Sequence, residues 1–98
     1  MRTKFLKSAD GKRIIRLRAI RSVRLEDGTG NGFWAARIRA KLRGGEEVTL
    51  AGYAACETFP DAPKIHARAA ADMERLLALL NGGRLRRGEE WPSSAKGE

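Results

Sequence analysis

The stretch WAARIRAKL, residues 34–42, alternates apolar side chains with basic ones from Ala36 onwards. The apolar positions are Ala36, Ile38, Ala40 and Leu42, and the basic positions, extended by one residue, are Arg37, Arg39, Lys41 and Arg43. Because successive side chains of a β-strand point to opposite faces, this period predicts a strand with one dry face and one basic face.

The segment after this strand predicts an antiparallel hairpin. Two glycines mark a turn, and Val48 and Leu50 then continue the apolar alternation towards a strand end near Tyr53. A three-residue loop, Gly44–Glu46, pairs Leu42 with Val48 and keeps both apolar sets on one face. Since a shift of one residue would expose that whole face, we expect this loop.

Three further strand segments are predicted upstream. Thr3–Lys7 has a strand pattern and is followed by Asp10-Gly11, a strong hairpin signal. Alternation in Arg13–Leu17 and in Arg21–Glu26 predicts two strand pieces, and Ile20 between them falls out of their shared apolar phase. A β-bulge or a single helical turn near residues 19–21 would account for this slip in phase.

The connector Asp27–Gly32 is rich in glycine and has two interpretations. Glycine-rich loops expose backbone N–H groups that can cradle a phosphate. The phosphate-binding motifs that do so open a helix, however, whereas this stretch leads into the strand-like segment Phe33–Ile38. We therefore predict a flexible hairpin loop.

A helix is predicted after a proline-containing loop. Thr58 or Asp61 would cap it, Pro63 suits its first turn, and Asn81–Gly83 is a typical stop. Apolar residues recur at helical spacing and form one stripe. They are Ile65, Ala69, Met73, Leu76, Leu77 and Leu80. Arg68 and Asp72 are expected to pair weakly on the outer face.

These elements predict an α+β fold: an antiparallel meander of about four to five short strands, with one C-terminal amphipathic helix packed on one sheet face. We expect a single α+β domain over residues 1–83 and a flexible C-terminal tail over residues 84–98. Trp91 is the exception in that tail. Three alternatives stay open for it: it packs back on the domain, anchors a partner, or is free in solvent.

The charge of the chain is concentrated in its first half. The 98 residues carry 20 Lys and Arg against 12 Asp and Glu, which gives a net charge of +8. Residues 1–45 hold 13 basic and 3 acidic side chains, whereas residues 46–98 hold 7 and 9. Basic groups neutralise phosphates and release counterions, so this asymmetry makes nucleic acid a candidate partner.

The chain has a single cysteine, Cys56, and a single histidine, His66. An intrachain disulfide and a four-ligand zinc site are therefore excluded, and we expect a reducing, cytoplasmic location and no metal. The basic N-terminal residues lack the apolar run of an export signal. Because the apolar runs are also far shorter than the ~20 residues that cross a bilayer, we expect no membrane partner.

Cys56 and His66 also raise the hypothesis of a nucleophile with its base. A third orienting group and an oxyanion motif are missing from the sequence, and lone cysteines are more often small buried hydrophobes. We therefore predict that the chain is not an enzyme and uses no cofactor.

Two functions are weighed for the remaining features. The first is a small binding or regulatory module that acts through protein–protein contacts or self-association, because a modest core gains stability from a partner. The alternative is RNA or DNA binding through a basic sheet face, for which exposed aromatics are scarce. The residues predicted for that face are Arg16, Arg18, Arg37, Arg39, Lys41, Arg43 and Tyr53.

Overall fold

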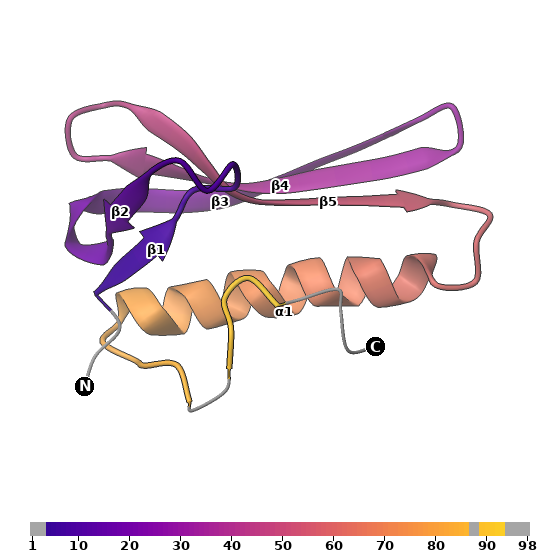
Figure 1. Ribbon diagram of the computed structural model, residues 1–98. Helices are drawn as coiled ribbons and strands as arrows, with labels where there is room; N and C mark the ends of the chain where they lie inside the picture. Colours follow the sequence, from indigo (N-terminus) through magenta and orange to yellow (C-terminus); the bar gives the residue numbers. More distant parts are fainter. Residues whose placement is uncertain (1–3, 87–88, 94–98) are drawn as a thin grey trace.

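Two successive hairpins build the larger of two antiparallel sheets (Figure 1). The computed structural model describes residues 4–86 and 89–93. In chain order its elements are β1 (Phe5–Lys7), β2 (Ile14–Arg16), the 3₁₀ helix η1 (Leu17–Ala19), β3 (Ile20–Gly30), β4 (Phe33–Leu42), β5 (Glu47–Cys56) and α1 (Ala62–Leu80). The larger sheet has the order β3-β4-β5, and β1 pairs with β2. The α+β class is confirmed, with the strands divided between two sheets.

The β3–β4 turn consists of only two residues, Asn31 and Gly32. Both have positive φ, 53° and 79°, as the tight turns that match strand twist require. Gly30 therefore pairs directly with Phe33. The predicted loop over residues 27–32 was too long, because residues 27–30 continue β3.

The predicted slip in apolar phase is confirmed, and both alternatives occur together. The chain makes one turn of 3₁₀ helix, η1, between β2 and β3. The pairing with β4 then shifts between Ile20 and Ser22, which marks a bulge at Arg21. These two irregularities bring Ile20 back to the buried side of the sheet.

The β4–β5 hairpin differs from the predicted register. Leu42 pairs with Glu46, whose carbonyl accepts the Leu42 N–H at 2.8 Å, so the loop is Arg43–Gly45. Gly45 takes φ 92°, which favours glycine at this position. Ala40 consequently faces Val48. The loop length was predicted correctly, but the loop begins one residue earlier.

A bulge in β5 changes which side chains face the helix. Ile38 pairs with Ala51 and Arg39 with Thr49, so Leu50 is an extra residue. The alternation of β5 therefore reverses at this point. Residues on both sides of the reversal are buried: Val48, Leu50, Ala51, Tyr53 and Ala55.

The helix α1 lies along one face of the larger sheet, chiefly against β5 and β4 (Figure 1). Pro63 lies in its first turn as predicted, and Asp61 precedes the helix without a capping side-chain hydrogen bond. Its buried positions are Ala62, Ala69, Asp72, Leu76 and Leu79. Leu77, predicted in the buried stripe, is 44% exposed, because the stripe advances by three and four residues through Asp72 to Leu79.

Candidate interaction surfaces

The open face is the side of β3, β4 and β5 that is turned away from α1. Its positions follow from the cross-strand register, since directly paired residues share a face. Arg24 pairs with Arg39, Glu26 with Arg37 and Lys41 with Glu47. Arg37, Arg39 and Lys41 therefore share one face, as predicted, but two carboxylates lie among them.

Ion pairs link the charges of the open face into a network. The Arg24 guanidinium contacts Glu26 at 2.8 Å and Glu47 at 2.5 Å. Glu26 also lies 3.6 Å from Arg37 and 3.7 Å from Arg39. The hydrogen bonds from Arg24 hold the pKa of both carboxyl groups below their ordinary value. Much of the predicted basic row is thus already paired with acidic side chains.

Tyr53 does not lie on the open face, which corrects its predicted position. The bulge at Leu50 turns Tyr53 towards α1, where it is buried and its hydroxyl donates to Asp72 Oδ2 at 2.7 Å. Burial and this hydrogen bond raise the pKa of the phenol well above its ordinary value. The sequence alone does not reveal the bulge, so Tyr53 was placed on the wrong face.

Arg16, Arg18 and Arg43 gather elsewhere, around η1. Together with Arg21 they line a shallow hollow of about 750 Å³, here called the arginine hollow. The Arg43 Nε donates to the Arg18 carbonyl at 2.9 Å, which ties the β4–β5 loop to η1. Among the described residues, none of the four guanidinium groups has an ion-pair partner. The hollow therefore gathers four arginines whose charge no carboxylate of the described residues compensates.

Apolar side chains are exposed beside the arginine hollow, on the outer face of the β1–β2 hairpin. Phe5 pairs with Arg16 and Lys7 with Ile14, so these four side chains share that face. Phe5 is 50% exposed and Ile14 is 69% exposed. The Arg16 guanidinium lies 5.9 Å from the centre of the Phe5 ring. On the open face Phe33 is 58% exposed, but among the described residues no arginine of that face lies over its ring.

The outer edge of β3 is a third candidate surface. The two-residue turn makes Gly30 and Phe33 a hydrogen-bonded pair, and such pairs alternate along an antiparallel ladder. The even-numbered residues of β3 therefore bond to β4. The N–H and C=O groups of Val23, Leu25 and Asp27 point away from the sheet. No backbone hydrogen bond between described residues uses them. We call this row the β3 edge.

Cys56 and His66 are engaged in separate contacts. The Cys56 thiol lies 3.1 Å from the Thr58 hydroxyl, and this hydrogen bond lowers the pKa of the thiol. The His66 ring stacks on Trp34 with centroids 4.0 Å apart, and its Nε2 is 3.8 Å from Glu57. Within the described residues, no hydrogen bond connects Cys56 to His66. The hypothesis of a nucleophile with its base therefore gains no support from these contacts.

A cluster forms around Asp72, a residue that the sequence predicts on the outer face of the helix. Asp72 is only 1% exposed. Its carboxylate accepts from Tyr53 at 2.7 Å and from the Ser93 backbone N–H and hydroxyl at 3.1 and 3.0 Å. Arg75 lies 3.4 Å from the same carboxylate.

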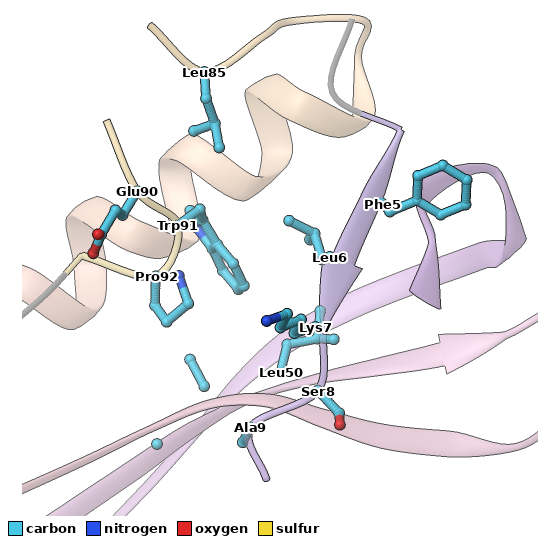
Figure 2. Close-up of a pocket in the computed structure, with 12 residues that line it drawn as sticks. Phe5, Leu6, Lys7, Ser8, Ala9, Leu50, Leu85, Glu90, Trp91 and Pro92 are labelled. Atoms are coloured by element: carbon cyan, nitrogen blue, oxygen red, sulfur yellow. The ribbon is translucent and has the colours of Figure 1, made fainter. Parts of the chain in front are cut away.

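Trp91 completes this cluster. Of the three alternatives left open for it, the structure shows that it packs back on the domain. It is buried, and its indole N–H donates to the Asp72 carbonyl at 2.7 Å. Figure 2 shows Trp91 extending from the C-terminal segment towards Leu6 and Leu50. The described part of the predicted tail thus packs back on the domain at Trp91, and residues 87–88 and 94–98 lie outside the described residues.

Comparisons with known proteins yield no relative. No protein-family model matches the chain, and no curated protein or solved structure matches it either. Among the described residues there is no group of three or more His, Cys, Asp or Glu side chains that could hold a metal ion. Of the helices in residues 4–86 and 89–93, none has both the length and the apolar character needed to cross a membrane.

Proposed function

We propose that this chain is a small non-enzymatic binding module that acts through protein–protein contacts at the β3 edge. The observation that carries the proposal is the row of outward N–H and C=O groups at Val23, Leu25 and Asp27. An edge of this kind is a template for another strand, and proteins that do not use one usually shorten, charge or cover it. β3 spans 11 residues, which is long for an edge strand.

The opposite edge of the sheet favours β3 as the contact strand. The backbone N–H of Ala9, in the β1–β2 turn, donates to the Thr49 carbonyl of β5 at 2.8 Å. The N-terminal hairpin therefore occupies part of the β5 edge. The β3 edge has no such cover among the described residues, so it is the better site for strand addition.

Strand addition can be tested with a charge directed into the edge. Leu25→Lys places an ammonium group on the helix side of β3, where an added strand would bury it. The immobilised wild-type chain and the Leu25→Lys variant are compared for the proteins each retains from lysate. Ala54→Lys, at an exposed position of β5, is the matched control.

The expected result is a protein retained by the wild type and by Ala54→Lys but lost with Leu25→Lys. Because Leu25 is half-buried, Thr29→Pro serves as a second variant: Thr29 is exposed, and its N–H points outward. Equal retention by all four chains would contradict the proposal. Circular dichroism is the check that each variant is folded.

A second candidate function is the binding of single-stranded nucleic acid at the arginine hollow. It is supported by four arginines without ion pairs beside an exposed Phe5 ring. Arginine neutralises phosphates, and an aromatic ring provides a surface on which a base can stack. The candidate site differs from the sequence prediction, because Arg37 and Arg39 are engaged with Glu26 instead.

Salt dependence tests this second function. Fluorescence anisotropy with labelled oligouridine and with duplex DNA is measured at several salt concentrations. Arg18→Ala and Arg21→Ala should each reduce the slope of log K against log salt by up to ~0.7 for a single strand. Arg37→Ala is the control and should leave that slope unchanged. The hypothesis fails if no oligonucleotide binds at low salt, or if Arg37→Ala has the same effect as Arg18→Ala.

A further inference from the structure

We propose that the partner of the β3 edge is a second copy of this chain, which adds antiparallel so that Leu25 of one copy faces Leu25 of the other. The inference rests on the proposed function, because it assigns an occupant to the same edge. The result would be a two-fold symmetric dimer with one continuous six-stranded sheet and both helices on the same side of it.

The backbone limits the registers that such a dimer can adopt. Outward N–H and C=O groups must meet outward groups, so odd-numbered residues of β3 pair with odd-numbered residues of the copy. A change from one allowed register to the next therefore moves the cross-strand partner of every residue by two positions. Full overlap of Ile20–Gly30 with its copy places Leu25, the middle residue, on the symmetry axis. Val23 then faces Asp27 of the other copy.

The charges on the open face favour the same register. With Leu25 on the axis, Arg24 of each copy faces Glu26 of the other, which gives two opposite-charge pairs. The neighbouring registers place Arg24 opposite Arg24, or Glu26 opposite Glu26. Each direct cross-strand pair contributes roughly 0.2–1 kcal/mol, and like charges are destabilising. The segment Arg24-Leu25-Glu26 is thus self-complementary only around Leu25.

Incomplete cover on the helix side of β3 supports the presence of a neighbour. α1 packs chiefly against β5 and β4. Val23 and Leu25, on the helix side of β3, are consequently only partly buried. A second β3 would bring two Leu25 side chains together and remove apolar area from water, which stabilises association.

Charge reversal at two positions tests both the dimer and its register. Arg24→Glu places two glutamates on the edge, and Glu26→Arg places two arginines there. Each variant alone should dissociate at protein concentrations at which the wild type is dimeric, because both cross-strand pairs become like-charged. A mixture of the two variants should form a heterodimer, since every Glu then faces an Arg. Sedimentation velocity measures the three samples beside the wild type.

Arg37→Glu is the matched control, because it reverses a charge on the same face but on the central strand β4. It should leave the dimer intact. Arg24 and Arg37 are exposed and Glu26 is half-buried, and ion pairs so close to solvent contribute little to folding, so the variants should stay folded. Circular dichroism checks this for each chain.

The outcomes separate this inference from the proposed function. A monomeric wild type at high concentration overturns the homodimer, and the β3 edge is then judged by the Leu25→Lys comparison alone. If Arg24→Glu and Glu26→Arg are still dimeric and Leu25→Lys is monomeric, the proposed register is overturned. The β3 edge then remains the contact between the copies. If the wild type and all four variants are dimeric, the contact between copies lies elsewhere and the homodimer at the β3 edge is overturned, and the edge is again judged by the Leu25→Lys comparison alone.

Discussion

Tyr53 of β5 donates a hydrogen bond of 2.7 Å to the carboxylate of Asp72 in the middle of α1, and both side chains are buried. This contact connects the sheet to the helix across the core. The same carboxylate accepts from Ser93, so one acidic group joins three parts of the chain.

The first prediction concerns this hydrogen bond. Tyr53→Phe removes one donor to a buried carboxylate and should lower the free energy of unfolding by about 1.5–3 kcal/mol. Chemical denaturation of the wild type and of Tyr53→Phe measures this difference in the free energy of unfolding. Tyr53→Phe should leave the slope of the transition unchanged. An unchanged midpoint would show that the hydroxyl contributes nothing.

The second prediction concerns alkaline pH. Because the folded state raises the pKa of the Tyr53 phenol, folding favours its protonated form. The stabilisation is therefore complete below the ordinary tyrosine pKa and is lost as the pH rises above it. Thermal unfolding should show a steeper alkaline loss of stability in the wild type than in Tyr53→Phe. Parallel pH profiles of the two chains would contradict this assignment.

The third prediction concerns Trp91. Trp91→Ala removes a buried ring and its hydrogen bond to Asp72, so it should destabilise the fold by about 3 kcal/mol. Trp91→Phe retains most of the apolar area and should lose less. Thermal unfolding followed by far-ultraviolet circular dichroism compares the three chains. Equal stability of wild type and Trp91→Ala would show that the C-terminal segment does not pack in solution.

The fourth prediction concerns the β3–β4 turn. Gly32→Ala forces a side chain into the left-handed region at φ 79° and should cost about 1 kcal/mol or more, although space is open around it. Gly28→Ala is the control, because Gly28 has no positive φ and no atom near the added Cβ. Denaturant midpoints should fall for Gly32→Ala alone. Equal midpoints for both variants would exclude backbone strain at this turn.

The fifth prediction concerns the reactivity of Cys56. The hydrogen bond with Thr58 lowers the pKa of the thiol, which raises the thiolate fraction near neutral pH. Thr58→Ala should therefore slow alkylation by iodoacetamide and move its pH profile upward. Thr49→Ala, near the opposite end of β5 from Cys56, is the control. An unchanged profile in Thr58→Ala would show that the hydrogen bond does not form in solution.

Strict alternation made β4 predictable, and with it the class of the fold. The helix was equally accessible, because its apolar residues recur at helical spacing between Pro63 and Asn81. What sequence could not supply was the bulge at Leu50, since a sheet can take an extra residue wherever packing rewards it. That single insertion moved Tyr53 from the predicted face to the core.

The candidate surfaces were predicted less well than the fold. Period-two alternation placed Arg37, Arg39 and Lys41 together correctly, but it could not show which acidic residues of β3 would face them. Asp72 was assigned to solvent because charged residues are seldom buried without partners. Its partners Tyr53 and Ser93 are 19 and 21 residues away, and only the folded chain brings them close.

Amide hydrogen exchange along β3, followed by NMR at low and at high protein concentration, tests the central claim most directly. The amides of Arg24 and Glu26 bond to β4 and should be protected at both concentrations. Those of Val23, Leu25 and Asp27 should exchange rapidly in dilute solution and become protected as the dimer forms. Rapid exchange of these three amides at every concentration would contradict the claim that a second copy occupies the β3 edge.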